Sequence, residues 1–589
     1  MSRTLSLVLA FGTALAWGGP PKIAKDVDTK SFSDDSIIVK FSVPPGTKHH
    51  QHVAALGGTL NSVPGLLNTA AYKIPGKLIP LLAVDPDIQF IAKDHAVQAS
   101  APGAVPPPPG GWIGAQPDNG WHAIGADQAT NVFGLTGYGV GVAVIDSGLD
   151  NLDDLKDVNG KNRIVYSQSF VPGDPSTGDK FGHGNHVAGI LGGTGRDSYG
   201  SKYSYYVRGI APGVNFINLR VLDANGQGSD SAVIAAISQA IALKSTYNIR
   251  VINLSLGRPV SDYCSNDLLC QAVQAAWQSG IAVVVAAGND GRNNQYGNNG
   301  YATIDSPGNN PYVITVGAMN TEGTPTETDD VITTYSSKGP TLLDHFAKPD
   351  LVAPGNRIYS VRHNGSSLDN GNPGNRVPHK MYMVNGDNGD GNYFVLSGTS
   401  MATPMVSGAV ALMLQQDPTL TPDQIKARLM KTADKFPAQS YTITDPSTGQ
   451  TFPEQNDIFT IGAGYLDIPA ALSNTDKVAS PALSPTAVYD PATGNVTLAF
   501  SSGSSASNVL WGSNVLWGSM AVWGTNAIQP NMAVWGTMAV WGTSSVSGSN
   551  VLWGSSAVWG TNVLWGSSST SGSNVLWGSS TAAIQGDTN

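Results

Sequence analysis

Residues 397 to 404 read Ser-Gly-Thr-Ser-Met-Ala-Thr-Pro and stand between two apolar segments. Tyr393 to Leu396 before them are typical of a strand, and Ser400 to Gln416 have the length and small apolar residues of a buried helix. A serine at the start of a helix lies beside unpaired backbone N–H groups and the positive end of the helix dipole. Those groups suit an oxyanion, but serine is also a common helix N-cap. This stretch alone leaves both interpretations of Ser400 open.

Two further stretches favour a catalytic serine. Val140 to Ile145 form a continuous apolar run, typical of a strand buried on both faces, and the run ends at Asp146. His183 lies in the stretch Gly-His-Gly-Asn-His and begins a second helix of small residues. Asp, His and Ser in this chain order form one of the known orders of a catalytic triad. A serine hydroxyl needs a neighbouring base, which a neutral imidazole supplies and a carboxylate orients.

Together these stretches resemble the subtilisin-like serine proteases, over residues 112 to 473. The resemblance implies that Asp146, His183 and Ser400 form the triad, and that the amide of Asn289 shares the oxyanion hole with the Ser400 backbone N–H. Without the triad, a turn residue after a strand is the favoured interpretation of Asn289. An α/β-hydrolase esterase fits less well, because its motif needs Gly two residues after the serine, where this chain has Ala402.

The catalytic region alternates apolar strands with helices, which predicts an α/β domain with a parallel sheet covered by helices on both faces. Its predicted strands are 141–145, 215–222, 250–256, 281–286 and 312–316. Its predicted helices are 183–191, 231–243, 268–279 and 400–416. Functional groups in such sheets collect at the carboxyl ends of the strands, where Asp146 and Asn289 stand.

The same resemblance places the substrate cleft. We expect Gly226-Gln227-Gly228 and Ser255-Leu256-Gly257 to pair with an extended polypeptide substrate from opposite sides. Ala287 and Gly288 are expected to line the pocket for P1, the substrate residue before the scissile bond. Asp305 stands where the family often has Gly at the floor of this pocket. A carboxylate there favours Arg or Lys at P1; the alternative is an Asp that caps its own loop.

The N-terminal region predicts export and a removable inhibitor. Residues 1–16 have the basic start, apolar core and small-residue end of a signal peptide, so we expect an extracellular protein. Residues 17–111 are expected to be a small α+β propeptide with a proline-rich linker. The resemblance implies that the propeptide is a folding template and inhibitor, with its tail Ala96 to Ser100 in the active site, and that maturation occurs between Ser100 and Trp112. Three histidines there, His49, His50 and His52, suggest either a solvated helix start or a metal site.

Composition narrows the function classes. The formal net charge is -10 and no basic block occurs, which argues against nucleic-acid binding. Cys264 and Cys270 are the two cysteines; in a secreted protein they favour a disulfide, and two free thiols are the alternative. No catalytic cofactor is expected. Structural calcium is common in the family, and the resemblance leads us to expect at least one ion in the domain. Two acidic clusters do not match a calcium loop, so solvated loops are the favoured interpretation at both places. The clusters are Asp153, Asp154 and Asp157, and Asp387, Asn388 and Asp390.

A repetitive tail follows a Pro/Ser/Ala-rich linker, residues 474–508. In residues 509–589, Trp-Gly recurs at spacings that are all multiples of six, from Trp511 to Trp577. An even period places every Trp on one face of an extended chain, and regular repeats suggest stacked β structure. The tail is then an aromatic strip for polysaccharide or a cell surface, a self-packed β-solenoid, or a flexible secretion tail.

Two functions follow. The first is a secreted serine endopeptidase, made as an autoprocessed proenzyme that cleaves polypeptides in extended conformation. The second is a surface-binding protein with a vestigial protease domain, acting through its Trp repeats. The complete Asp, His, Asn and Ser set favours the endopeptidase.

Overall fold

The computed structural model describes residues 22–99, 120–294, 298–436, 439–444, 449–479, 481–488 and 496–500, and the backbone of 489–490, 495, 552–553 and 564–565. The predicted signal peptide, the predicted maturation region after β5 and most of the Trp-Gly tail lie outside these residues. The described residues form two compact units, one within residues 1–63 and 67–93 and the other within residues 64–66 and 94–589. Within the described residues, no helix has the length and apolar character to cross a membrane.

The first unit is built on an antiparallel sheet of order β2-β3-β1-β4. Its strands are β1 Asp34–Phe41, β2 Thr59–Ser62, β3 Thr69–Pro75 and β4 Ile88–Lys93, and its helices are α1 Thr47–Ala55 and α2 Ile79–Leu82. Alternate residues of β1 point into a core completed by α1 and α2, since Ile37, Val39, Val53 and Leu82 are buried together.

The three histidines of α1 are partnered by side chains far along the chain. His49 is 4% exposed, and its Nε2 lies 3.1 Å from a carboxylate oxygen of Asp87. His52 Nδ1 lies 3.0 Å from Asp85 Oδ2. The expectation of a solvated helix start is therefore wrong for His49, because its carboxylate partner, Asp87, stands 38 positions later in the chain.

The second unit is built on a mainly parallel sheet of order β14-β13-β12-β10-β6-β8-β7, with β15 also pairing with β13. Among these pairings only β13 with β14 is antiparallel. The central strands are buried on both faces, as their continuous apolar runs predict. The bounds are β6 Gly141–Asp146, β7 Ile164–Ser169, β8 Asn215–Arg220, β10 Ile249–Leu254, β12 Ala282–Ala286, β13 Ile314–Asn320, β14 Val331–Ile332 and β15 Leu351–Pro354.

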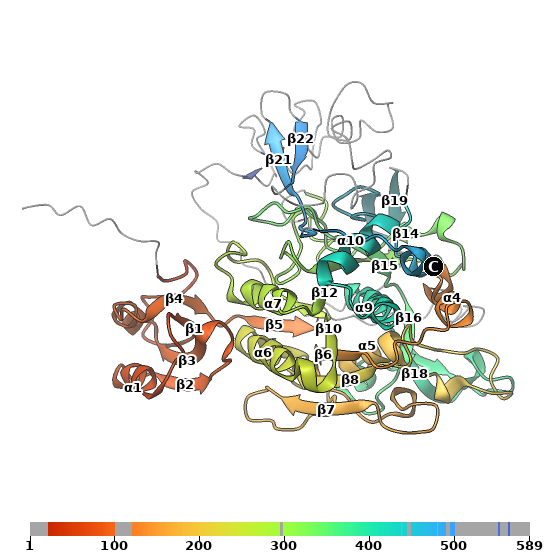
Figure 1. The fold of residues 1–589 in the computed structure, drawn as a ribbon, viewed down its shortest axis with the longest axis horizontal. Helices are drawn as coiled ribbons and strands as arrows, with labels where there is room; N and C mark the ends of the chain where they lie inside the picture. The colour runs from red at the N-terminus through yellow and green to blue at the C-terminus, as the bar shows by residue number, and fades with distance from the viewer. Residues whose placement is uncertain are drawn as a thin grey trace, which may run out of the picture. The chain divides into compact units, whose positions relative to one another are not determined.

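Helices cover both faces of this sheet, as the alternating pattern predicts. The helices α6 and α7 pack together against β6, β8, β10 and β12, and α5 and α9 pack together on the other side of the strands (Figure 1). The helix bounds are α3 Gly120–Ala123, α4 Ala126–Asn131, α5 His183–Gly192, α6 Asp230–Tyr247, α7 Leu268–Gln278, α8 Ser367–Gly371, α9 Thr399–Gln416, α10 Pro422–Thr432 and α11 Ile468–Ser473.

Short strands complete the second unit. One small sheet has the order β11-β5-β9 and another β16-β18-β17, and two hairpins follow, β19-β20 and β21-β22. Two further strands in the tail, β23 and β24, pair in parallel. Their bounds are β5 Ala96–Ala99, β9 Gln227–Ser229, β11 Leu256–Gly257, β16 Ile358–Val361, β17 Arg376–Pro378, β18 Asp390–Leu396, β19 Ser440–Thr444, β20 Thr451–Gln455, β21 Thr486–Asp490, β22 Asn495–Ala499, β23 Leu552–Trp553 and β24 Leu564–Trp565.

The segment that composition marks as a linker packs on the second unit. Ser484 Oγ donates to Asp350 Oδ1 at 2.6 Å and is 3.0 Å from Lys426 Nζ. Asp350 also pairs with Lys348 at 2.6 Å. All of these side chains are buried, so residues near 484 contribute to the polar core of the unit.

Candidate functional site

Asp146 and His183 stand at the ends of two neighbouring elements. Asp146 is the last residue of β6, and His183 is the first residue of α5. Gly182 caps α5 with a left-handed φ of 102°, and a Cβ there would lie 2.4 Å from Ser366 Oγ. Glycine is thus required at the turn that delivers His183.

A buried hydrogen bond joins the two side chains. His183 Nδ1 lies 2.8 Å from Asp146 Oδ1, and the two residues are 0% and 1% exposed. The same carboxylate oxygen accepts a hydrogen bond from the Ser147 backbone N–H at 2.7 Å and lies 3.2 Å from the Ser147 hydroxyl. The Ser147 N–H therefore holds the carboxylate oxygen that orients the ring of His183.

A second buried carboxylate, which the sequence analysis missed, holds the loop before His183. Asp179 accepts hydrogen bonds from Gly182 N at 2.7 Å, Asn185 N at 2.8 Å and Ser147 Oγ at 2.7 Å. Burial raises the pKa of Asp179 above its ordinary value. The only signal in the sequence is an acidic residue shortly before a helix start, which is too common to single it out.

The other histidine of α5 is not a candidate base. His186 is buried, and its Nε2 lies 3.1 Å from the carbonyl oxygen of Phe394. Burial lowers the pKa of His186 to about 3, so its imidazole stays neutral and structural.

Ser400 lies in the first turn of α9 rather than at its cap. Gly398 is the N-cap and Thr399 is the first helical residue, so the interpretation of Ser400 as an ordinary N-cap is wrong. Ser400 is 0% exposed, and its Oγ donates to the carbonyl oxygen of Ser255 at 3.0 Å. Among the described residues, His183 Nε2 makes no hydrogen bond.

Asn289 is bound to the start of α9 by its side-chain oxygen. Its Oδ1 accepts hydrogen bonds from the Thr399 backbone N–H at 2.9 Å and the Thr399 hydroxyl at 3.1 Å. The amide nitrogen is therefore the end directed away from Thr399. This orientation places a donor group beside the first turn of the helix that carries Ser400.

The two predicted cleft segments pair with a strand of the chain itself. Strand β5 lies between β9 and β11, antiparallel to both. Gln98 is paired with Gln227 and with Gly257, and Ala99 is paired with Leu256. Ala99 N also donates to the carbonyl oxygen of Gly226 at 3.0 Å. An extended peptide thus fills the place where the sequence predicts the substrate backbone.

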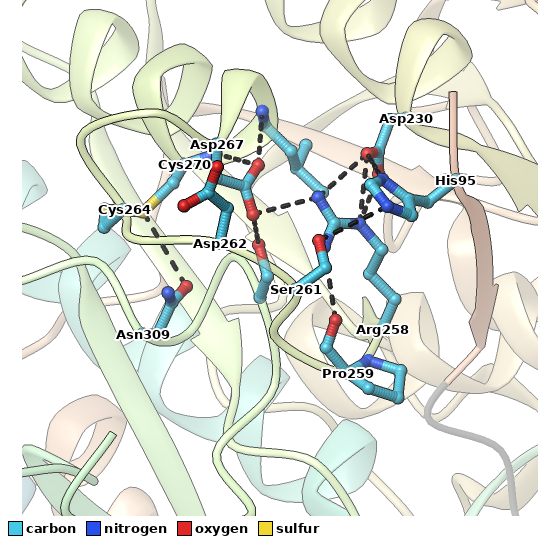
Figure 2. Close-up of polar contacts among 12 residues, drawn as sticks. His95, Asp230, Arg258, Pro259, Ser261, Asp262, Cys264, Asp267, Cys270 and Asn309 are labelled. Carbon is cyan, nitrogen blue, oxygen red and sulfur yellow. Dashed lines mark hydrogen bonds and ion pairs between the residues drawn. A yellow bond between two sulfur atoms is a disulfide. The ribbon is translucent and has the colours of Figure 1, made fainter. Parts of the chain in front are cut away.

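The two residues before β5 bind the start of α6. The Asp94 carboxylate accepts hydrogen bonds from Ser231 N at 2.9 Å and Ser231 Oγ at 2.7 Å. His95 Nδ1 lies 3.1 Å from Asp230 Oδ2. Asp230 in turn pairs at 2.9 Å with Arg258, which follows β11 (Figure 2).

Arg258 is the centre of this buried network. Its guanidinium lies 2.9 Å from Asp267 Oδ2 as well as from Asp230, and it is 4% exposed. Asp267 also caps α7 through Leu269 N and Cys270 N. Cys270 forms a disulfide with Cys264, with their Cα atoms 5.4 Å apart (Figure 2). The network therefore ties β5, α6, β11 and α7 to one another.

The predicted pocket residues lie beside β11. Asp305 N donates to the carbonyl oxygen of Ala287 at 2.9 Å, and Ser337 N donates to that of Gly288 at 3.0 Å. Residue 306 exchanges two backbone hydrogen bonds with Arg258, at 3.0 and 2.8 Å. The chain segments 255–258, 287–289 and 305–306 thus lie next to one another.

The acidic clusters considered for calcium are engaged by protein groups. Asp154 accepts from Tyr393 Oη at 2.9 Å and from Asp197 N at 2.8 Å. Asp153 pairs with Lys156, Asp387 with His379 and Asp390 with Arg376. Within the described ranges, no group of three or more His, Cys, Asp or Glu residues is arranged to hold a metal ion. These carboxylates do not fit a calcium site.

Comparison with known proteins identifies the family. The model of the subtilase family matches residues 137–464. Serine protease AprX of Bacillus subtilis (strain 168) is 38% identical over 311 residues, which cover 51% of this chain and 63% of AprX. Subtilisin E of the same strain is 31% identical over 409 residues, covering 69% of this chain and 86% of subtilisin E. The extracellular serine proteinase of Thermus sp. (strain Rt41A) is 32% identical over 370 residues, covering 62% of this chain and 70% of that protein.

A solved structure supports the fold. The crystal structure of fervidolysin from Fervidobacterium pennivorans superposes with a TM-score of 0.56 at 22% identity, over 78% of this chain and 63% of fervidolysin. The predicted α/β fold with a subtilisin-like sheet is therefore confirmed. With the family match over the residues that carry the Asp146–His183 pair and Ser400, the chain belongs to the subtilase family of serine proteases.

Proposed function

We propose that this subtilase is a secreted serine endopeptidase in which Asp146, His183 and Ser400 form the catalytic triad. The buried 2.8 Å contact between Asp146 Oδ1 and His183 Nδ1 carries the proposal. With Nδ1–H donated to the carboxylate, Nε2 is the ring nitrogen that can accept a proton. Ser400 is supplied by α9, which packs against α5.

The reaction begins with a change of hydrogen-bond partner. Ser400 Oγ exchanges its bond to the Ser255 carbonyl for one to His183 Nε2, loses its proton there and attacks the substrate carbonyl. Asp146 then stabilises the imidazolium, and His183 returns the proton to the leaving amine. The Asn289 amide and the Ser400 backbone N–H hold the negative oxygen of the tetrahedral intermediate.

Hydrolysis of casein by the secreted protein tests the proposal. We expect internal cleavage, seen as peptides with new N- and C-termini by mass spectrometry, and complete inhibition by a fluorophosphonate that reacts with activated serine. Absence of hydrolysis by protein that is folded and free of residues 22–99 would contradict it.

Removal of the Asn289 amide should slow turnover with little effect on substrate binding. We expect Asn289→Ala to lower kcat about 100- to 1,000-fold with KM nearly unchanged, because the amide contacts the oxyanion and not the ground-state substrate. Steady-state kinetics on one peptide substrate measure both constants. A rise in KM at unchanged kcat would assign Asn289 to substrate binding instead.

We further propose that residues 17–99 are an inhibitory propeptide and that β5 is its bound tail. Its antiparallel pairing with both β9 and β11 is the geometry of an extended peptide in a protease cleft. Maturation, between Ser100 and Trp112, separates this segment from the enzyme. The relative named extracellular serine proteinase and the Cys264–Cys270 disulfide support export.

The Asp94–His95 segment would fasten this tail in a pH-dependent manner. Burial raises the pKa of Asp94 from 3.8 to about 6 in the docked segment. A carboxyl whose pKa rises on docking takes up a proton, so Asp94 strengthens docking as the pH falls from about 6 to about 4 and adds no pH dependence above 6.

Loss of the His95 side chain should weaken the hold on β5. We expect His95→Ala to raise about tenfold the protein concentration at which half the processed chains are inhibited, since a hydrogen bond to the charged Asp230 is lost. Dilution of freshly processed full-length protein, followed with a peptide substrate, measures this midpoint. His122→Ala is the matched control. His122 is more exposed than His95, and its contact with Asp127 is longer, at 3.9 Å, and therefore weak. Equal midpoints for the two variants would show that His95 does not hold the tail.

For the Trp-Gly tail we propose a structure and no function. The backbone pairing of Leu552 with Leu564 and of Trp553 with Trp565 has an offset of whole repeats, which favours stacked β structure. No comparison supports the alternative of a surface-binding protein with a vestigial protease domain. A role for the tail at a polysaccharide or cell surface stays a prediction from its sequence.

A further inference from the structure

Asp305 lies between the segment that binds β5 and the segment that leads to Asn289. Its backbone N–H donates to Ala287 O at 2.9 Å, and the next residue is paired with Arg258. Gly257, one residue before Arg258, is paired with Gln98 of β5. A peptide in the place of β5 therefore pairs with residues 256–257, and Asp305 lies in the chain segment that neighbours these residues.

The Asp305 side chain faces bare backbone on both sides. A Cβ built on Gly288 would lie 2.7 Å from Asp305 Oδ2, and one built on Gly257 would lie 3.2 Å from the same oxygen. Glycine at both positions leaves the carboxylate in contact with the two segments and uncovered by their side chains. Any side chain at Gly288 would press on this carboxylate.

A second carboxyl group lies close to the first. Asp290 follows Asn289, and its backbone N–H donates to Ser337 Oγ at 3.0 Å. Burial, together with the negative charge of Asp290, raises the pKa of Asp305 well above its ordinary value. Burial raises the pKa of Asp290 as well. The two acids thus share one poorly solvated region.

Among the described residues, Asp305 has no ion-pair partner of its own. Within the described part of the chain, no hydrogen-bond donor contacts the Asp305 carboxylate. The positive charge of Arg258 acts on it, but Arg258 is held by Asp230 and Asp267 at 2.9 Å each. A cation from outside the protein would therefore stabilise the ionised form of Asp305 more than any group now in contact with it.

We propose that Asp305, assisted by Asp290, forms the anionic floor of the P1 pocket, so that the enzyme prefers substrates with Arg or Lys before the scissile bond. This inference rests on the proposed protease function, because it takes the β5 position as the substrate path. Two features carry it, the peptide strand seated on Gly257 and the unpaired carboxylate behind that glycine. A guanidinium can bind a carboxylate through two hydrogen bonds, which favours Arg over Lys.

The proposed preference for a basic P1 residue has to agree with the predicted maturation site of the chain itself. No Lys or Arg occurs between Lys93 and Lys156, so a maturation cut between Ser100 and Trp112 has no basic P1 residue. An attached segment reacts with the large effective concentration of an intramolecular step, on the order of 10⁵ M or more. The proenzyme can therefore cut a poor sequence in itself and still select basic residues in other proteins.

Peptides that differ only at P1 test the inference. We expect kcat/KM of the mature enzyme to be highest for Arg, followed by Lys, and lowest for the neutral residues Gln and Leu. In Asp305→Asn, kcat/KM for Arg should fall about 30- to 100-fold, the loss of a charge-assisted hydrogen bond, with less than threefold change for Leu. In the wild type the Arg-to-Leu ratio should rise with pH as Asp305 ionises, and this rise should vanish in Asp305→Asn. Asp290→Asn should lower the same ratio by a smaller factor.

Two controls keep the outcomes separate. Asp153→Asn removes an acid that is exposed on the surface and should leave every ratio unchanged. Titration of each variant with the fluorophosphonate counts competent sites. Normal titration with no preference for Arg in the wild type, or with an unchanged Arg-to-Leu ratio in Asp305→Asn, would overturn this inference alone. Absence of any titratable serine in the wild type would overturn the proposed function and this inference with it.

Discussion

Ser400→Ala should abolish peptide hydrolysis, with kcat/KM reduced about 10⁶-fold, the size of the loss that subtilisin shows for its nucleophile. The substitution removes the hydroxyl that attacks the substrate and leaves the remaining contacts of α9 in place. The lost Oγ bond to the Ser255 carbonyl costs about 1 kcal/mol, too little to unfold the protein. Hydrolysis of a P1-Arg peptide measures the activity, and thermal denaturation checks the fold.

The same variant should also stay uncut. Without the nucleophile, full-length chains should accumulate with residues 22–99 still attached, whereas the wild type releases them. Ser473→Ala is the control, since Ser473 is an exposed serine at the end of α11. Processing of Ser400→Ala at the normal rate in purified form would show that maturation depends on another protease.

Asp146→Ala should lower kcat about 10⁴-fold, the second largest effect. The change removes both the acceptor that orients His183 and the negative charge that stabilises the imidazolium. Asp146→Asn separates the two roles. The Ser147 N–H holds Oδ1 toward His183, so an amide oxygen there would still orient the ring but would carry no charge.

We therefore expect Asp146→Asn to retain more activity than Asp146→Ala while still losing at least about 100-fold. Kinetics of both variants on one peptide, with Asp153→Asn as the control for removal of an unrelated carboxylate, measure the difference. Equal losses in the two variants would show that charge alone matters, and activity within tenfold of the wild type would exclude Asp146 from the triad.

The sequence predicts those parts of the fold that depend on local patterns of apolar and small residues. The buried strand β6 and the helices α5 and α9 were predicted within a residue or two, because long apolar runs and small residues specify them over a short distance. The candidate site follows from these elements, since Asp146, His183 and Ser400 stand at their ends. The family resemblance added Asn289, which the local pattern could not distinguish from a turn residue.

The supporting contacts could not be predicted, because they join residues remote in sequence. Asp94 meets Ser231 across 137 positions and His95 meets Asp230 across 135. The strands β9 and β11 are too short to show a period, and their glycines read as turns. The surroundings of Asp305 are likewise formed by three segments together, so its two interpretations stay open from the sequence.

The most direct test of the central claim is the chemical labelling of the nucleophile. The mature enzyme is treated with a fluorophosphonate, digested and mapped by mass spectrometry, with His183→Ala treated in parallel. We predict one adduct per chain, on Ser400, in the wild type and a labelling rate at least about 10³-fold lower in His183→Ala. An adduct on another serine, or equal labelling of both proteins, would contradict the assignment of His183 as the base that activates Ser400.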